Sequence, residues 1–256
     1  MITLDELKKN KYLLNLNLGQ IEKNYIHIMV LFVISKLFPN KLIFKGGTCM
    51  MVCYNLDRFS EDLDFDLVED LDLESVLSKI KLFLKKYDII IDYKITIKKY
   101  EDCLIYFYGP LYKNNPNNNT RCKIKLDFSR RNDYSKNLEI VKVNHIYNEI
   151  PVFYIKALSL DEIFSEKIRA IIERNKARDL YDLQYLINRK VNLDLNLINK
   201  KLSLNDRKFN LKEFISAIDN KKEIWDKEMK NLLKIYPSFK EISKEVINFV
   251  KNNIKD

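Results

Sequence analysis

Glycine is scarce in this chain, and the position of one adjacent pair constrains the fold. Only four of the 256 residues are glycine, and two of them stand together at Gly46-Gly47. The short apolar run 42–44 precedes the pair, and the mostly apolar segment 48–54 follows it. This order predicts a strand, a tight turn and a helix. Backbone without Cβ atoms at the start of a helix lets a phosphate approach free N–H groups closely.

The acidic residues that follow repeat with the period of a strand. Residues 59–67 alternate acidic with apolar side chains, which predicts a strand with one polar face. On such a strand Asp62 and Asp64 point the same way, about 7 Å apart. Carboxylates at that distance repel each other unless a cation lies between them, and Mg²⁺, which prefers oxygen ligands, suits that place. A solvated acidic face is the alternative, and it fits Glu61 and Asp66 better than this pair.

A third acid lies on a separate predicted strand. Asp127 stands between apolar neighbours in the segment KIKLDF, residues 123–128. Two-metal phosphoryl transfer uses such a carboxylate, because it can bridge an ion and help to deprotonate the attacking hydroxyl. A surface acid that closes a strand is an equally good account of Asp127 by itself, since Asp is disfavoured inside strands and tolerated at their ends.

The remaining patterns divide the chain into two lobes. Further predicted helices cover residues 20–38 and 73–87, and further predicted strands cover 89–97, 103–108 and 122–128. Beyond Pro151 the pattern is helical almost to the C-terminus, opening at Ser159 with the spacing of a capping box. We therefore expect an α+β fold: a mixed sheet flanked by helices over residues 1–158, and a helical lobe over 159–256 that completes an active-site cleft.

Charged residues also occur in the apolar pattern of the helical part. Lys167 lies on an apolar stripe, and lysine is almost never fully buried without a partner. Its ammonium group either reaches water or enters a cleft to pair with phosphate or carboxylate. Asp179 and Asp182 are one helical turn apart and repel each other unless cations approach. Nearby cations that could do so are Lys167, Arg174, Lys176 and Arg178.

Composition limits the partners and the compartment. The net charge of +9 and the pI near 9.1 favour a polyanionic partner, although an AT-rich genome would enrich lysine with the same result. The four cysteines form no Cys-x-x-Cys pair, and with only two histidines present we expect reduced, packed thiols instead of a zinc site. The acidic N-terminus is unlike a signal peptide, and the longest apolar run, 28–34, is too short to span a bilayer. A cytoplasmic protein without a membrane span is expected.

A glycine turn, an Asp-x-Asp motif and a strand acid in this order resemble the polymerase-beta-like nucleotidyltransferase superfamily. Within it, FKGGT at residues 44–48 and RFSEDLDF at 58–65 resemble the AbiEii-type toxins. The distal motifs of that family can be matched to SEK at 165–167 and RDLYDL at 178–183. The resemblance covers roughly residues 42–186. It implies a polymerase-beta-like nucleotidyltransferase lobe and a metal-dependent enzyme that moves a nucleoside monophosphate from an NTP to an acceptor hydroxyl.

The resemblance also implies roles for particular residues. Mg²⁺ or Mn²⁺ would be held by Asp62, Asp64 and Asp127, which are also catalytic. The NTP would be bound by Gly46, Gly47, Thr48, Arg58, Ser60 and Lys167. Lys167 would contact the phosphates, and either Asp179 or Asp182 would be catalytic. In some relatives the serine at the place of Ser60 is phosphorylated by a partner antitoxin, but a hydroxyl that hydrogen-bonds within its turn is the simpler account here.

The acceptor implied by the resemblance is the 3′ end of tRNA, which would make the chain the toxin of a toxin–antitoxin or abortive-infection system with a cognate antitoxin. An enzyme that modifies protein hydroxyls would use the same NTP site with less need for positive charge. A non-catalytic module that binds RNA or a partner is a third alternative, which the complete set of acids argues against. An antibiotic-modifying enzyme would more naturally present an acidic cleft to a cationic drug.

Overall fold

The computed structural model describes residues 1–97, 101–131, 134 and 138–254, and of Ile97 and Glu101 it describes the backbone only. The chain divides into two compact units. The first unit holds Met1–Asn55, Ser60–Asn132 and Ile140–Ala157. The second unit holds Leu56–Phe59, Asp133–Glu139 and Leu158–Asp256. The short segment Leu56–Phe59 thus belongs to the second unit, although the residues on either side of it belong to the first.

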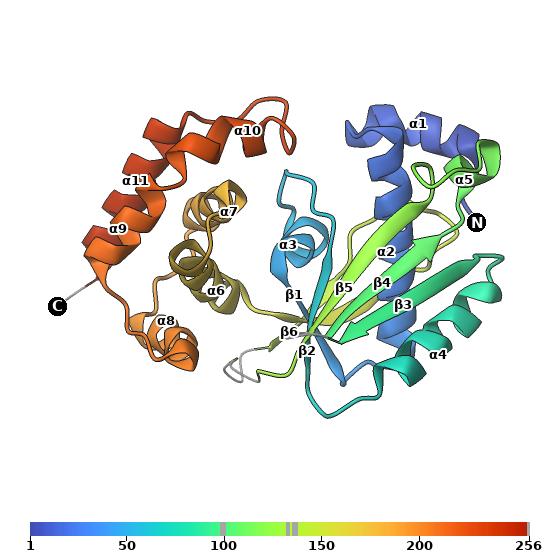
Figure 1. Ribbon diagram of the computed structural model, residues 1–256, viewed down its shortest axis with the longest axis horizontal. Helices are drawn as coiled ribbons and strands as arrows, with labels where there is room; N and C mark the ends of the chain where they lie inside the picture. The colour runs from blue at the N-terminus through green and yellow to red at the C-terminus, as the bar shows by residue number, and fades with distance from the viewer. Residues whose placement is uncertain (98–100, 132–133, 135–137, 255–256) are drawn as a thin grey trace. The chain divides into compact units, whose positions relative to one another are not determined.

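The first unit is built on a mixed sheet of the order β3-β4-β5-β2-β1-β7-β6, seven strands within the described part of the chain (Figure 1). The strands are β1 (Leu42–Lys45), β2 (Leu63–Leu67), β3 (Ile91–Ile97), β4 (Glu101–Phe107), β5 (Cys122–Ser129), β6 (Leu138–Lys142) and β7 (Tyr154–Leu158). β2 runs parallel to β5 and β1 runs parallel to β7, whereas β1–β2, β3–β4 and β4–β5 are antiparallel. The predicted α+β class with a mixed sheet is confirmed.

Helices flank this sheet. They are α1 (Leu4–Leu14), α2 (Leu18–Leu37), α3 (Gly46–Tyr54), α4 (Leu73–Lys85) and α5 (Pro110–Asn114). The predicted helix 20–38 is confirmed as α2, which begins after the cap Asn17 and is buried along most of its length. α2 packs on β5 and on α4, and α4 packs on β3. The side chains of β4 and β5 alternate accordingly, with Ile105 and Ile124 buried and their neighbours partly or fully exposed.

The strand register gives the centre of the sheet two unlike faces. Three phenylalanines are paired across β1, β2 and β5: Phe44, Phe65 and Phe128. Their ring centroids lie 5.3 and 5.8 Å apart, and all three rings are buried. The next positions along the strands pair four charged residues across β1, β2, β5 and β4, here called the polar row: Lys45, Asp64, Asp127 and Asp102. Because successive side chains alternate, the polar row lies on the face opposite the aromatic rings.

Two local predictions about the glycines and the acids need correction. β2 begins at Leu63 and not near Phe59, so Asp62 stands one residue before the strand. The preceding segment Leu56–Phe59 lies in the second unit, which removes it from the sheet. The strand before the glycines also passes into the helix without a separate turn, because α3 begins at Gly46 itself.

Two strands near the end of the first unit were not predicted. Residues 154–158 were expected to be helical, but they form β7, whose Ala157 is paired with Phe44 of β1. β6, which adjoins β7 in the sheet, was not predicted either. β7 is only five residues long, and its place beside β1 is set by a partner more than 100 residues earlier in the chain. No local pattern reports such a pairing.

The second unit is helical, as predicted for the chain after Ser159. Its helices are α6 (Leu160–Glu173), α7 (Ala177–Asn188), α8 (Leu195–Leu202), α9 (Leu211–Asp219), α10 (Trp225–Met229) and α11 (Phe239–Asn253), with 3₁₀ turns η1 (Ser203–Asn205) and η2 (Lys222–Ile224). The Ser159 side chain caps α6 by accepting a hydrogen bond from the Glu162 N–H group. The carboxylate of Glu162 forms a wholly buried ion pair with Lys201 at 2.6 Å. The capping serine is therefore confirmed.

The cysteine prediction agrees with the structure. All four cysteines are buried free thiols, as expected for packed, reduced side chains. Across the residues that the structure describes, no helix combines the length and the apolar character needed to cross a membrane.

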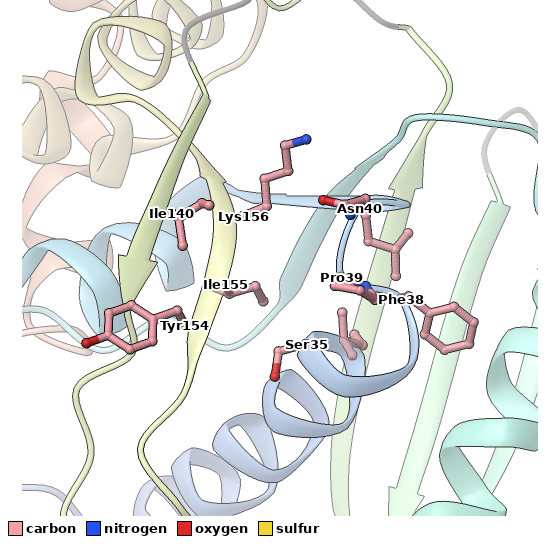
Figure 2. Close-up of a pocket in the computed structure, with 10 residues that line it drawn as sticks. Ser35, Phe38, Pro39, Asn40, Ile140, Tyr154, Ile155 and Lys156 are labelled. Carbon is pink, nitrogen blue, oxygen red and sulfur yellow. The ribbon is translucent and has the colours of Figure 1, made fainter.

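A small pocket of about 140 Å³ lies at one end of the sheet of the first unit (Figure 2). Its lining comes from the end of α2 and from β1, β6 and β7: Ile34, Ser35, Phe38, Pro39, Asn40, Leu42, Ile140, Tyr154, Ile155 and Lys156. Leu42 opens β1 and the glycine pair follows the end of that strand, so this pocket is at the other end of β1. It contains none of the residues predicted for the functional site.

A buried acid on α2 makes stability depend on pH. Glu22 is almost fully buried and accepts a hydrogen bond from the Leu111 N–H group at 2.8 Å. Burial raises the pKa of Glu22 to about 7. A carboxyl with a raised pKa favours the folded state while it is protonated, and that contribution is lost as pH rises from about 4.5 through about 7.

Glu22→Gln is therefore expected to raise the free energy of unfolding at pH 8 by about 2 kcal/mol, and to change it little near pH 4.5. Urea unfolding curves at the two pH values would measure this difference. Glu223→Gln, at an exposed position, is the matched control and should leave both curves unchanged. Equal effects of Glu22→Gln at both pH values would contradict the assignment.

Candidate active site

Gly46 joins β1 to α3 in a conformation that requires glycine. Its φ is +76°, in the left-handed region that side chains disfavour. A Cβ atom at this position would also lie 2.8 Å from Cγ of Asp64, closer than carbon atoms approach without repulsion. The Asp64 carboxylate therefore lies directly against the start of α3. The first N–H groups of a helix lack partners within the helix, so an acidic group and free N–H donors meet at this point.

Two buried side chains hold the loop that carries Asp62. The Thr48 hydroxyl donates a hydrogen bond to the backbone carbonyl of Asp62. His27 Nε2 lies 2.9 Å from the carbonyl oxygen of Glu61. Burial lowers the pKa of His27 to about 3, so its ring is neutral at pH 7 and donates Nε2–H to that carbonyl. The Thr48 hydroxyl thus positions Asp62. The backbone N–H group of Thr48, in the first turn of α3, is directed to the same end of the helix as those of Gly46 and Gly47.

Asp64 and Asp127 are paired residues on the parallel strands β2 and β5, which lie about 4.8 Å apart. Lys125 reaches Asp127 at 2.6 Å and Asp102 at 3.2 Å. Burial, with contributions from the neighbouring Asp102 and Asp64, raises the pKa of Asp127 to about 6 against the lowering effect of Lys125. The structure therefore brings two of the predicted metal ligands together on one face. It also adds Asp102 and Lys125, which the sequence analysis did not single out.

The donor set at this place suits a hard divalent cation. No group of three His, Cys, Asp or Glu side chains is arranged as a metal site in the described portion of the chain. Mg²⁺ nevertheless binds through one or two carboxylates together with substrate phosphates and water. Asp64 and Asp127 supply such a pair of carboxylates, with Asp62 two residues from Asp64. A cation there would offset the repulsion that contributes to the raised pKa of Asp127.

Asp66 proved not to be the solvated surface acid that the alternation favoured. Its side chain is fully buried, and it pairs with Lys45 at 2.7 Å. Glu61 is exposed as expected and pairs with Lys23 at 2.7 Å. Lys45 stands directly before Gly46, so this buried pair fixes the end of β1 against β2.

Three residues of the distal motifs gather with two arginines inside the second unit in a cluster whose members, apart from the exposed Arg174, are buried. It is here called the ion network: Arg58, Lys167, Arg174, Asp179 and Asp182. Lys167 is only 6% exposed, and it pairs with Asp182 at 2.6 Å and with Asp179 at 3.2 Å. Of the two outcomes considered for this lysine, the structure shows pairing with carboxylates. Asp179 is also bonded by both Arg174 Nε and Nη2 at 2.8 Å.

Asp182 has a partner that no local pattern revealed. Arg58 Nε and Nη2 donate to its two oxygens at 2.5 and 2.6 Å, across 124 residues of sequence. Burial alone would raise the pKa values of Asp179 and Asp182, but the charges of Lys167, Arg174 and Arg58 outweigh burial and lower both values. The two acids are therefore ionised at neutral pH. The roles implied for Lys167, Asp179 and Asp182 in catalysis stay predictions.

Three other residues were predicted to bind the NTP: Gly47, Ser60 and Arg58. Gly47 and Ser60 are half-buried residues of the first unit, Gly47 in the first turn of α3 and Ser60 on the segment that leads into β2. Arg58 belongs to the second unit, where its guanidinium group is taken up by Asp182 and the carbonyl of Phe59. Binding of an NTP by these three residues stays a prediction.

Gly46→Ala is expected to reduce activity at the polar row at least about 100-fold and to destabilise the protein by about 2 kcal/mol. The added Cβ would displace the Asp64 side chain, and φ would stay in a disfavoured region. Gly19→Ala is the matched control, since its Cβ would meet only Asn17 Oδ1, at 3.4 Å. Thermal melts and turnover assays of both variants test this prediction. Equal activity of the two variants would contradict the requirement for glycine at position 46.

Comparison with known proteins gives one family and several similar structures. The family model described as nucleotidyl transferase AbiEii toxin, Type IV TA system, matches residues 30–245. This match confirms the resemblance carried by the glycine pair and the Asp-x-Asp motif. A search of curated proteins found no match.

Two solved structures are similar over most of the chain. JHP933 from Helicobacter pylori is 22% identical, with a TM-score of 0.63, and the match covers 93% of this chain and 92% of that one. MenT4, the nucleotidyltransferase toxin Rv2826c from Mycobacterium tuberculosis H37Rv, is 15% identical, with a TM-score of 0.63 and coverage of 92% and 85%. At these identities the likeness concerns the fold.

Proposed function

Since this chain belongs to the AbiEii family of nucleotidyltransferase toxins, we propose that it transfers a nucleoside monophosphate from an NTP to a hydroxyl at the 3′ end of an RNA, with tRNA as the expected acceptor. The family is that of a type IV toxin–antitoxin system, so an antitoxin partner and a nucleotide substrate are implied.

One observation carries the proposal: the Asp64 carboxylate lies against Gly46 and beside Asp127. A triphosphate bound at the first turn of α3 would receive N–H donors from Gly46, Gly47 and Thr48. Asp62, Asp64 and Asp127 would hold Mg²⁺ or Mn²⁺. When bound, such a cation neutralises charge that develops on the phosphates.

A residue of the chain would accept the proton that the acceptor hydroxyl releases. The acceptor hydroxyl oxygen forms a bond to the α-phosphorus, the bond between that phosphorus and the bridging oxygen breaks, and diphosphate leaves with the electron pair. The hydroxyl proton passes to Asp127, whose pKa of about 6 suits a general base near neutral pH. His27 and Thr48 keep the Asp62 loop in place through its backbone carbonyls.

An RNA acceptor agrees with the charge of the chain. Its 45 basic residues exceed its 36 acidic ones, and a polyanion gains affinity by releasing counterions when such a surface binds it. A protein acceptor would need no excess of this kind.

Incubation with each of the four NTPs, labelled at the α-phosphate, and with total cellular RNA tests the proposal. We expect label at RNA 3′ ends, identified by sequencing, and its loss when a chelator removes divalent cations. Asp64→Asn is the inactive control. Label that appears in protein and not in RNA would overturn the RNA acceptor, and the absence of any transfer with all four NTPs would overturn the reaction.

A further inference from the structure

The polar row continues into a line of basic residues on the same face of the sheet. On β5 the residues at alternate positions before Asp127 are Lys125 and Lys123, and Arg121 stands just before the strand. Residues two apart share a face and are separated by about 6.6 Å along a strand. Arg121 is therefore about 20 Å from Asp127 along this line. Lys125, Lys123 and Arg121 are here called the basic track.

The outer part of the basic track forms no direct ion pair in the described part of the chain, although Arg121 is among the charges, after Lys81, that lower the pKa of Asp92. Lys125 is paired with Asp102 and Asp127. Lys123 is exposed, and neither it nor Arg121 takes part in an ion pair among the residues that the structure describes. Positive charge therefore increases along β5 with distance from the polar row.

The guanidinium group of Arg121 packs against two tyrosine rings. Its guanidinium carbon lies 4.2 Å from the ring centroid of Tyr106 and 5.9 Å from that of Tyr108. The Tyr108 hydroxyl is fixed by a bond to Asp92 at 2.9 Å. The Arg121 Nε atom is buried and has no hydrogen-bond partner in the described part of the protein. A guanidinium plane supported on one side by an aromatic ring is a surface on which a nucleobase can stack.

We propose that the basic track binds the single-stranded segment that precedes the reacting 3′ end of the RNA acceptor, an inference that rests on the function proposed above. With the terminal hydroxyl at Asp127, the preceding phosphates would lie along β5 beside Lys125, Lys123 and Arg121. The spacing of these cations is of the same order as that of successive phosphates in an extended strand. A base would stack on Arg121. Cations arranged in a line with a stacking platform favour a single strand over a folded protein surface.

Binding of a labelled single-stranded RNA of twelve nucleotides, followed by fluorescence anisotropy, tests the track. The measurement uses the full chain carrying Asp64→Asn, so that no transfer occurs. Adding Arg121→Glu and Lys123→Glu should weaken binding at least tenfold at about 100 mM salt, and should reduce the salt dependence by about two phosphate contacts. Adding Lys85→Glu and Lys86→Glu, at the exposed last residue of α4 and the exposed residue that caps it, changes the net charge equally and should weaken binding less than threefold. Equal losses in the two pairs would overturn the proposal.

A milder variant separates loss of contact from loss of fold. Arg121→Gln with Lys123→Gln removes both charges without adding acids, and circular dichroism melts should match those of the parent chain. Binding as tight as that of the parent would overturn the track. Acceptor length gives a second measure: RNAs shorter than about four nucleotides cannot reach Arg121, so the Gln pair should not change their binding.

Transfer by the otherwise wild-type enzyme distinguishes the two proposals. If the wild-type chain labels RNA 3′ ends and the Arg121→Gln, Lys123→Gln variant does so with an unchanged KM for RNA, the basic track is wrong and the proposed function stands. If the wild-type chain labels no RNA, the proposed function fails, whatever the anisotropy shows. A raised KM for RNA with an unchanged KM for NTP supports the track.

Discussion

Asp64→Asn is expected to slow nucleotide transfer at least about 1000-fold and to leave the free energy of unfolding within about 1 kcal/mol of the wild-type value. Asn keeps the shape of the side chain that lies against Gly46, so no clash arises. It removes the charge that would hold a divalent cation beside Asp127. It also removes a like charge from that acid, so the protein should not be destabilised. Transfer of labelled NTP and urea unfolding measure the two quantities.

Asp88→Asn is the control for this change. Asp88 is an exposed residue of the first unit with a φ of +56°, a conformation that Asn also tolerates. It should keep full activity and stability. Retention by Asp64→Asn of more than a tenth of the wild-type rate would contradict the role proposed for the polar row.

Asp182→Asn is expected to lower the free energy of unfolding by about 3 kcal/mol at pH 7. The aspartate is fully buried and accepts bonds from Arg58 and Lys167, so its loss leaves cationic charge buried without adequate compensation. The same argument gives a pH dependence: the lowered pKa means that these pairs stabilise the fold above about pH 4, and that the contribution is lost as pH falls further. Urea unfolding at pH 7 and below pH 4 measures both.

A double variant separates the cost of an unpaired charge from a loss of packing. Arg58→Met with Asp182→Leu removes both partners and should recover part of the stability lost in Asp182→Asn. A stability of Asp182→Asn equal to the wild-type value would show that the ion network contributes little. Transfer assays at low temperature, where the variant remains folded, also address the catalytic role implied for Asp182. Loss of turnover in a fully folded Asp182→Asn sample would favour that role.

Local patterns predicted the elements that carry the candidate site. α2 was expected at 20–38 and begins and ends within two residues of that range. β1, α3 and β5 were placed by an apolar run, a glycine pair and strict alternation, all of which depend on neighbours in sequence. The acid at 127 could be assigned to a strand, but its position opposite Asp64 could not. That pairing is set by the strand order.

The features that the sequence did not predict depend on distant partners. Residues 59–62 alternate like a strand, yet the chain there leaves the sheet, and neighbouring Arg58 bonds Asp182 in the second unit. Asp66 has the pattern of a surface acid, but Lys45 on the adjacent strand allows it to be buried. Asp102 gains its place beside Asp127 only through the register of β4 with β5. In each case the deciding contact joins segments that are far apart in sequence or paired across strands.

The parallel pairing of β2 with β5 has a consequence for a toxin during its own synthesis. The ribosome completes the glycine pair, Asp62 and Asp64 long before it reaches Asp127, which lies 63 positions after its partner Asp64. Non-local pairing of this kind forms slowly compared with helices. A nascent or prematurely terminated copy that stops short of β5 therefore lacks Asp127, the fourth member of the polar row and the base proposed for the acceptor hydroxyl. The enzyme should therefore become active in the cell that makes it only after most of the first unit has left the ribosome.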